Sequence, residues 1–311
     1  MPAGLLGIEA LERGEIQAIL DRAKDFQPPQ GQSFRRLDLL RGKMIVNLFF
    51  ESSTRTRTSF EIAAKRLGAD LVSITAAGSS VSKGESLVDT LNTLVAMRPD
   101  AIVMRHQASG APHFLARYLP RTPIINAGDG THEHPTQALL DARTILDQKP
   151  ALEGLRVAII GDIAHSRVAR SNIYLLSKFG ASIVLCGPAP LLPCELAMIA
   201  PGVRLTNDIR EAITGADVIM MLRVQLERQK EAAFPAGEYF QFYGLHLEHL
   251  DLMKPDALVM HPGPINRGRE ISSEVADSQR SVILNQVENG VAVRMAVLER
   301  IVGGGNAEAA H

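Results

Sequence analysis

Hydroxyl and guanidinium side chains fill five consecutive positions of the sequence, Ser53-Thr54-Arg55-Thr56-Arg57. They follow an apolar segment typical of a buried strand and begin a helical pattern. The amides at a helix N-terminus lack partners within the helix and carry the positive end of its dipole, which suits a bound anion. Guanidinium groups add bidentate contacts to phosphate oxygens. A plain Ser or Thr helix cap is the alternative, but this density of donors favours a phosphate site.

Arg105, His134 and Gln137 are further polar residues at positions where ligands bind. Arg105 follows a strand pattern, at the carboxyl edge where open α/β sheets bind ligands, although such an arginine can also be plain surface. His134 precedes Pro135, which suits the first position of a helix. The positive helix end favours a neutral imidazole that donates a hydrogen bond to a carbonyl oxygen. Gln137 is either a ligand contact or an exposed residue of the first helical turn.

Metal and dinucleotide sites are weaker interpretations. His132 and His134 form an H-x-H pair, but the sequence offers no partner cluster that completes a coordination sphere. The segment Gly161–Arg167 follows a strand and opens a helix, yet it lacks the G-x-G-x-x-G spacing of a dinucleotide site. We therefore expect no metal and no cofactor. Ser79 and Lys83 lie on a loop of small residues, which is either plain surface or a mobile loop that brings an ammonium group to an anion.

Apolar strands alternate with helical segments along nearly the whole chain. Continuous apolar strands separated by helices indicate parallel sheets that are covered on both faces. We therefore predict the α/β class, with doubly wound parallel sheets. The expected strands are Met44–Phe50, Leu71–Ile74, Ala101–Met104, Pro123–Asn126, Leu155–Ile160, Ser182–Cys186, Val218–Met221 and Ala257–Met260.

The 311 residues exceed one typical domain. We expect two domains, residues 1–134 and 150–280, joined by a helix over 135–149, with the active site in the cleft between them. A last helix over 281–302 stays with the second domain or returns to the first. We expect the tail, 303–311, to be disordered.

Composition narrows the classes of function. The formal net charge is −1 and the signs are mixed, which does not favour a nucleic-acid partner. No apolar run approaches the roughly 18 residues of a membrane span, and the first residues do not resemble a secretory signal. Cys186 and Cys194 flank a Gly/Pro-rich bend and are not expected to form a disulfide. We therefore expect a cytoplasmic protein.

Seven segments together resemble the aspartate/ornithine carbamoyltransferase family. They occur in the family's order and spacing over the whole chain, so we identify the chain as a member on this resemblance. The segments are Ser53–Arg57 (S-T-R-T-R), Gly78–Ser86 (lysine loop), Val103–His106, His134–Gln137 (H-P-T-Q), Gly161–Arg167, Arg223–Gln225 and His261–Pro264 (H-P-x-P).

The resemblance implies roles in binding carbamoyl phosphate first and the amino-acid substrate second. It assigns to the phosphate Ser53, Thr54, Arg55, Thr56 and Arg105. It assigns to the carbamoyl oxygen Thr56, Arg105 and His134, and to the carbamoyl amino group Gln137 and the loop Pro262-Gly263-Pro264, through the carbonyls of Pro262 and Gly263. It assigns to aspartate Lys83, Arg167, Arg223 and Gln225. Ser79 and Lys83 are expected from the neighbouring subunit of a homotrimer.

Aspartate is the expected second substrate because two arginines suit a dicarboxylate and repel the extra ammonium of ornithine. The ornithine branch is similar to H-C-L-P followed by S-M-G, whereas this chain has His261-Pro262-Gly263-Pro264 and no S-M-G. Gly263 replaces a leucine of some members, which predicts a more flexible loop with its carbonyl contacts retained. The implied reaction forms N-carbamoyl-L-aspartate, the committed step of de novo pyrimidine synthesis. Ornithine transfer and a non-catalytic scaffold are the alternatives, and regulatory chains or a dihydroorotase-like partner stay open.

Overall fold

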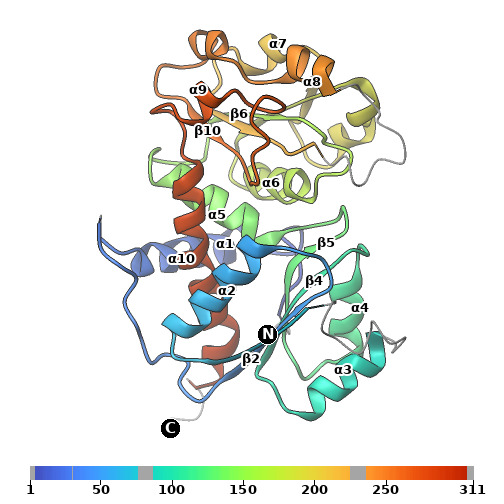
Figure 1. Ribbon diagram of the computed structural model, residues 1–311, viewed down its shortest axis with the longest axis vertical. Coiled ribbons are helices and arrows are strands. Elements are labelled where there is room, and N and C mark those ends of the chain that lie inside the picture. Colours follow the sequence, from blue (N-terminus) through green and yellow to red (C-terminus); the bar gives the residue numbers. More distant parts are fainter. Residues whose placement is uncertain (1–3, 30, 76–86, 225–235, 307–311) are drawn as a thin grey trace. The chain divides into compact units, whose positions relative to one another are not determined.

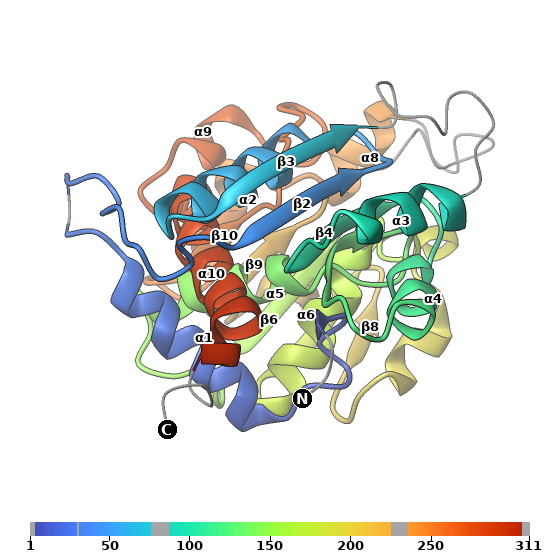
Figure 2. The ribbon, with the colours of Figure 1, turned by 90° about the horizontal axis from the view of Figure 1, so that it is seen from below.

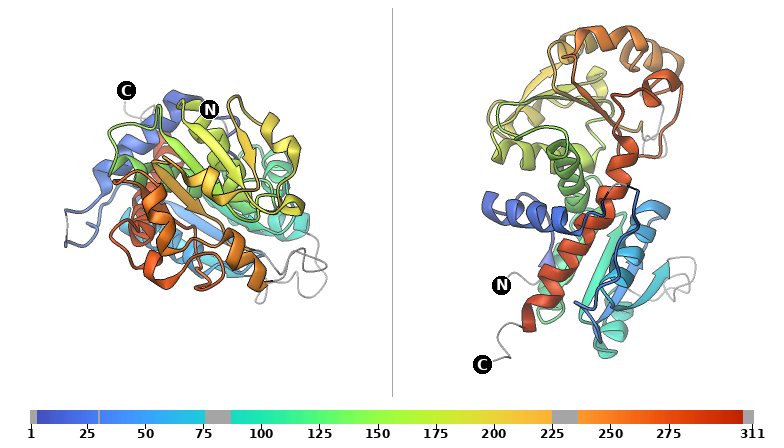
Figure 3. Two further views of the ribbon diagram at one scale, coloured as in Figure 1. Left: turned by 90° about the horizontal axis from the view of Figure 1, so that it is seen from above. Right: turned by 90° about the vertical axis from the view of Figure 1, so that its left-hand side faces the viewer.

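The structure is a computed structural model that describes residues 4–29, 31–75, 87–224 and 236–306 (Figure 1). The chain divides into two compact units. Unit 1 consists of Met1–Leu139 and Glu288–His311, and unit 2 of Leu140–Val287. Both divisions fall inside helices, α5 (Pro135–Leu146) and α10 (Ile283–Val302). The second of these is one uninterrupted helix (Figure 3).

Unit 1 contains a five-stranded, all-parallel sheet in the order β1-β5-β4-β2-β3. Most residues of β2, β4 and β5 are buried, and most of these are apolar, because helices cover both faces of this sheet. The strands are β1 (Gly4–Leu5), β2 (Met44–Phe49), β3 (Asp70–Thr75), β4 (Ala101–His106) and β5 (Ile124–Asp129). The helices wholly in this unit are α1 (Arg13–Phe26), α2 (Thr54–Arg66), α3 (Leu87–Ala96) and α4 (Ala111–Tyr118).

Helices lie on both sides of the unit 1 strands (Figure 2). Helices α3 and α4 bury Leu91 and Leu115 in one apolar cluster with Ile102 of β4. On the other side, α10 packs against α2. Arg294 of α10 donates a hydrogen bond to Ser59 Oγ at 2.9 Å, and its guanidinium carbon lies 5.1 Å from the centre of the Phe60 ring. These contacts fix α2, whose first turn carries the predicted phosphate motif.

The sheet of unit 1 has a switch point between its neighbouring strands β2 and β4. The chain leaves β2 toward β3 on one side and leaves β4 toward β5 on the other. Loops that depart in opposite directions open a crevice at the carboxyl ends of the two strands, where ligands of open α/β sheets bind. The motif Ser53–Thr56 follows β2, and Arg105 lies at the end of β4.

Unit 2 contains a second five-stranded parallel sheet, in the order β10-β9-β6-β7-β8. Its switch point lies between β6, which continues to β7, and β9, which continues to β10. The strands are β6 (Arg156–Ile160), β7 (Ser182–Cys186), β8 (Arg204–Thr206), β9 (Val218–Met221) and β10 (Leu258–Met260). The helices include α6 (Arg167–Lys178), α7 (Ile209–Ile213), α8 (Ala236–Tyr243) and α9 (Ser273–Ala276).

The core of unit 2 lies between the sheet and helices α7, α8 and α9. Side chains of one face of the strands, such as Cys186 and Ile219, pack with Ala212, Tyr239 and Val275. Burial raises the pKa of the Cys186 thiol to about 12. The residue is therefore a core side chain, and it is free, as is the exposed Cys194.

The predicted class, two parallel α/β sheets, is confirmed. Several elements had not been predicted, among them the short strands β1 and β8 and the first helix, α1. The expectation of a disordered tail was wrong at its start, where Gly303–Asn306 form a 3-10 helix that continues α10. Among the described residues, no helix is long and apolar enough to cross a membrane.

Candidate functional site

The phosphate motif occupies the start of α2 as predicted. Ser53 is the N-cap residue in extended conformation, and its side chain makes no capping hydrogen bond. The first turn contains no acidic residue that would neutralise the helix end. Thr56 is buried at 6% exposure, whereas Thr54 and Arg55 are exposed. The interpretation as a plain helix cap is therefore less favoured. The positive end of the helix dipole is not neutralised by a side chain of the first turn, which favours binding of an anion there.

Arg105 projects from the carboxyl end of β4, directly beside the end of β2. Backbone pairing joins it to Phe49, and the amide of Phe50 donates to the Arg105 carbonyl at 2.9 Å. Its side chain is 11% exposed. Nη2 donates to Glu51 Oε1 at 2.8 Å, and Nη1 donates to the Ala127 carbonyl at 3.2 Å. These two anchors hold the guanidinium at the same sheet edge as the start of α2.

His134 lies at the start of α5, on the loop that follows β5. The residue is 4% exposed, and its carbonyl accepts hydrogen bonds from the amides of Gln137 and Ala138. Gln137 is buried in the first helical turn rather than exposed. This corrects the alternative of a plain surface glutamine. Buried polar side chains at a helix N-terminus are suited to binding a polar ligand.

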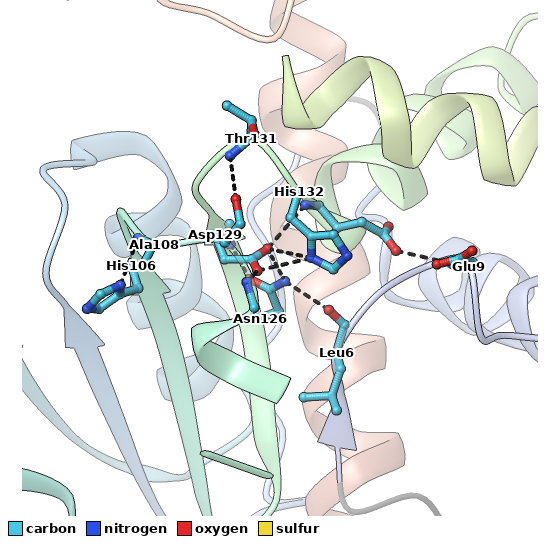
Figure 4. A network of polar contacts seen from close by, with 12 residues as sticks. Leu6, Glu9, His106, Ala108, Asn126, Asp129, Thr131 and His132 are labelled. Carbon is cyan, nitrogen blue, oxygen red and sulfur yellow. Dashed lines mark hydrogen bonds and ion pairs between the residues drawn. The ribbon is translucent and has the colours of Figure 1, made fainter. Parts of the chain in front are cut away.

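A buried carboxylate, Asp129, holds the loop before His134 in place (Figure 4). Its oxygens accept hydrogen bonds from Asn126 Nδ2 at 2.8 Å and from the amides of Gly110 at 2.6 Å and Glu133 at 3.1 Å. The loop also needs glycine at Gly130, where φ is +46° and a Cβ atom would lie 2.3 Å from Ser109 Oγ. The loop is thus fixed by its surroundings.

Glu133 ties the same loop to the N-terminal segment. It is 1% exposed, and its two oxygens accept from the Ile8 amide at 3.0 and 2.8 Å. A further bond of 3.2 Å comes from the amide of Glu9. Because buried amides without partners are costly, this carboxylate stabilises both segments. Sequence reasoning missed Glu133, since its partners lie more than a hundred positions away.

In unit 2, Arg167 is the first residue of α6, on the loop after β6. The residue is 5% exposed, and the preceding Ser166 caps the helix by accepting from the Ala169 amide at 3.1 Å. Asp162, directly after the strand end, is buried and lies 2.7 Å from Nδ1 of His165. The predicted arginine therefore lies on the loop of one switch-point strand.

Arg223 follows β9, the other strand at the switch point of unit 2. The next amide, that of Val224, donates to Glu270 Oε1 at 3.1 Å. Glu270 is fully buried, and the amide of Asn266 donates to its other oxygen at 2.9 Å. Burial raises the pKa of Glu270. This carboxylate, which sequence reasoning also missed, fixes the backbone beside Arg223.

The loop Pro262-Gly263-Pro264 follows β10 at the carboxyl edge of the same sheet. The Gly263 amide donates to His261 Nδ1 at 2.9 Å, and the His261 amide donates to Gln286 Oε1 at 2.9 Å. Gly263 has φ of +67°, a conformation that favours glycine, and the peptide bond to Pro264 is cis. The glycine thus serves the backbone conformation found here.

The predicted residues fall into two groups. Unit 1 holds Ser53–Thr56, Arg105, His134 and Gln137, and unit 2 holds Arg167, Arg223 and Pro262–Pro264. In each unit they follow strands at the carboxyl edge of the sheet. The predicted residues Ser79, Lys83 and Gln225 lie outside the described residues.

Comparison with known proteins agrees with this division. The chain matches the model of the aspartate/ornithine carbamoyltransferase carbamoyl-P binding domain over residues 4–147. It matches the model of the Asp/Orn binding domain of the same family over residues 153–301. The chain belongs to the aspartate/ornithine carbamoyltransferase family. The resemblance read from seven short motifs is confirmed.

Relatives and solved structures of this carbamoyltransferase family cover nearly the whole chain. An aspartate carbamoyltransferase catalytic subunit of Solibacter usitatus is 83% identical over 97% of this chain and 100% of its own length. The aspartate carbamoyltransferase catalytic subunit of Syntrophotalea carbinolica is 56% identical over 96% of this chain and 95% of its own length. An ornithine carbamoyltransferase of Pyrococcus furiosus has TM-score 0.87, 32% identity and 97% coverage of both chains. A Trypanosoma cruzi aspartate transcarbamoylase in complex with N-(phosphonacetyl)-L-aspartic acid has TM-score 0.81 and 32% identity, and the match covers 96% of this chain and 95% of that one.

Proposed function

We propose that this chain catalyses transfer of the carbamoyl group from carbamoyl phosphate to L-aspartate, as an aspartate carbamoyltransferase catalytic subunit. The product would be N-carbamoyl-L-aspartate, a precursor for pyrimidine synthesis. The observation that carries the proposal is the placement of arginines at the switch points of both sheets, Arg105 in unit 1 and Arg167 and Arg223 in unit 2. The 83% identity to a relative of that name supports the choice of substrate.

Unit 1 would bind carbamoyl phosphate at the start of α2. The first-turn amides and the hydroxyl groups of Ser53 and Thr54 would donate hydrogen bonds to the phosphate oxygens, and Arg55 would add its charge. Arg105 would bridge the phosphate and the carbonyl oxygen of the carbamoyl group. The support for this role is its fixed position beside the same strand ends, held by Glu51 and the Ala127 carbonyl.

The carbonyl oxygen would gain negative charge as the reaction proceeds. Thr56, Arg105 and His134 would donate hydrogen bonds to that oxygen, and donors fixed in advance stabilise such charge most effectively. Gln137 and the carbonyls of Pro262 and Gly263 would orient the carbamoyl amino group. The burial of Thr56, His134 and Gln137 supports this assignment, because each is a polar side chain held at a helix N-terminus.

Unit 2 would bind aspartate through Arg167 and Arg223, one for each carboxylate, with Gln225 and Lys83 as further contacts. A guanidinium matches a carboxylate in bidentate geometry. Two such groups favour a dicarboxylate over ornithine, whose side-chain ammonium they would repel. Glu270 would keep Arg223 in place through the neighbouring amide of Val224.

The chemistry needs no nucleophilic side chain. The deprotonated amino group of aspartate attacks the carbamoyl carbon and forms the new carbon–nitrogen bond. The carbon–oxygen bond to phosphate then breaks, the phosphate leaves with the bonding electrons, and it can accept the proton that the amine loses. Catalysis would come from orienting two bound anions and from stabilising the oxyanion.

The test of this function compares two amino-acid substrates. Purified chain, carbamoyl phosphate and either L-aspartate or L-ornithine are incubated, and carbamoyl product and phosphate are both quantified. We expect carbamoyl aspartate at a kcat/KM at least about a hundredfold above that for ornithine, in line with the loss caused by a misplaced charge in a polar site. Preferred turnover of ornithine would replace this function with the other branch of the family. A chain that turns over neither substrate would support a scaffold role.

We further propose that the chains form a homotrimer in which Ser79 and Lys83 enter the site of the adjacent chain. A cyclic interface repeats the same contact at every joint, so each chain gives one loop and receives one. Mixing Lys83→Ala with Arg105→Ala chains under exchange conditions should restore activity, with about one native site in each mixed trimer. If native electrophoresis detects mixed trimers and activity stays at background, Lys83 acts within its own chain.

A further inference from the structure

Two histidines and an aspartate that the proposed reaction does not use lie together in unit 1. They are His113 on α4, Asp129 at the end of β5 and His132 on the following loop. Each offers one potential ligand atom, and these atoms all lie within 4.8 Å of one another. Across the described ranges no other group of three or more His, Cys, Asp or Glu residues meets this condition. His134, the other member of the H-x-H pair weighed in the sequence analysis, does not belong to this group.

The geometry of the three residues is near that of a zinc site. Zinc bonds of 2.0–2.1 Å in a tetrahedron place ligand atoms about 3.3 Å apart. The ligand atoms of His113, Asp129 and His132 would therefore need to close by roughly 1.5 Å at most. His132 and Asp129 already face each other, with Nδ1 and Oδ2 3.0 Å apart (Figure 4). The two histidine ring centroids are 5.2 Å apart, edge to face.

A ring nitrogen of His113 supports the metal interpretation. Nδ1 of His113 is buried, and within the part of the chain that the structure describes it has no hydrogen-bond partner. A buried polar atom without a partner is costly unless an ion or water completes it. Asp129 has no freedom to turn away, because Asn126 and two amides fix its carboxylate. The side chain of His132 is 33% exposed, which leaves a path for an ion.

The donor set of the cluster indicates which ion it would take. His113 and His132 each offer an imidazole nitrogen, and Asp129 offers a carboxylate oxygen. Two imidazoles and one carboxylate suit zinc or another borderline transition metal and do not suit Mg²⁺ or Ca²⁺, which prefer oxygen ligands.

We propose that His113, Asp129 and His132 bind one Zn²⁺-type transition-metal ion with water in the fourth position. The ion would join α4 to the loop that precedes α5, and so stabilise unit 1. None of the three residues is assigned to a substrate in the proposed carbamoyl transfer, which needs no metal, and the metal proposal does not depend on that function.

The test titrates ZnCl2 into untagged, chelator-treated protein by calorimetry and follows the melting temperature. We expect one ion per chain and a melting temperature that rises by a few degrees. Replacing a ligand, as in His113→Gln or His132→Asn, should weaken binding by at least about a hundredfold, above the range for partners outside the coordination sphere. Added Co²⁺ should give the intense visible absorption of a tetrahedral site, and both variants should lose it.

His165→Asn is the matched control. His165 pairs with Asp162 at 2.7 Å, with side-chain exposures of 32% and 0%, which nearly match the 33% and 0% of His132 and Asp129. Among the residues that the structure describes, this pair belongs to no group of three potential metal ligands. This variant should keep the full zinc affinity. The proposal is overturned if wild type binds no zinc, if His132→Asn binds it as tightly as wild type, or if His165→Asn abolishes it. His132→Asn changes a partly exposed side chain, so the test holds even if His113→Gln fails to fold.

Discussion

Replacement of Arg105 tests the proposed phosphate site most sharply. In the structure this guanidinium donates hydrogen bonds to the Glu51 carboxylate at 2.8 Å and to the Ala127 carbonyl at 3.2 Å. Each hydrogen bond to a charged group contributes about 1.5–3 kcal/mol. Loss of its contacts to the phosphate and the carbonyl oxygen, partly replaced by water, should cost on the order of 3 kcal/mol in Arg105→Ala. That corresponds to roughly two orders of magnitude in kcat/KM.

The assay measures initial rates over a range of carbamoyl phosphate concentrations at saturating aspartate. Because Arg105 is assigned to the carbonyl oxygen as well as the phosphate, kcat should fall together with kcat/KM. Arg105→Lys keeps the charge but not the planar fork, so its activity should lie between wild type and Arg105→Ala. A change in apparent affinity alone would refute the polarising role, and a loss below about fivefold would place the phosphate elsewhere.

Arg22→Ala provides a matched control in the same unit. Arg22 donates to both oxygens of Glu299, at 2.6 and 2.7 Å, so its truncation also removes a hydrogen-bonded ion pair to a glutamate. It is not among the proposed binding residues. We expect kcat/KM within about twofold of wild type and a stability loss of about 1 kcal/mol or less, as for exposed ion pairs. Equal losses in both variants would mean that the effect of Arg105→Ala is structural.

Three further predictions concern other parts of the chain. Arg223→Ala should severely weaken the use of aspartate but leave calorimetric binding of carbamoyl phosphate nearly unchanged, and equal loss of both would reverse the assignment. Glu133→Ala leaves the amides of Ile8 and Glu9 without their carboxylate acceptor, so the free energy of unfolding should fall by about 2–3 kcal/mol and the melting temperature by several degrees. An unchanged melting temperature would contradict the stabilising role of Glu133. At pH 8 an aromatic disulfide should react with one thiol of the native protein, that of Cys194, and with two thiols after unfolding. The reason is that Cys186 is buried, which raises the pKa of its thiol to about 12. Two rapidly reacting thiols in the native protein would contradict this prediction.

Local sequence patterns predicted the strands and the motif positions because both depend on neighbouring residues. Apolar runs such as 101–104 must be buried strands, and a polar residue directly after such a run, such as Arg105, must lie at the carboxyl edge. The pattern failed for β8 (Arg204–Thr206), which is only three residues long and partly exposed. It also omitted α1, although Ile16, Ile19 and Leu20 have helical spacing.

Long-range partners could not be predicted from one sequence. Glu133 meets Ile8, which lies 125 positions earlier, and Glu270 meets Val224, which lies 46 positions earlier. Such pairings depend on the order of strands in the sheet, and no local pattern reports that order. The same reason explains why His113 was not connected with His132, since α4 and the loop after β5 come together only in the fold.

The central claim is that the phosphate site of unit 1 and the arginines of unit 2 serve one reaction. N-(phosphonacetyl)-L-aspartate combines a phosphonate and an aspartate in one molecule, so calorimetry of this compound tests the claim directly. We predict binding at least about a hundredfold tighter than that of phosphate or succinate, as for analogues of a transition state. Both Arg105→Ala and Arg223→Ala should weaken binding of this compound, whereas only Arg105→Ala should weaken binding of phosphate. Affinity no greater than that of phosphate, or full affinity in Arg223→Ala, would contradict the account.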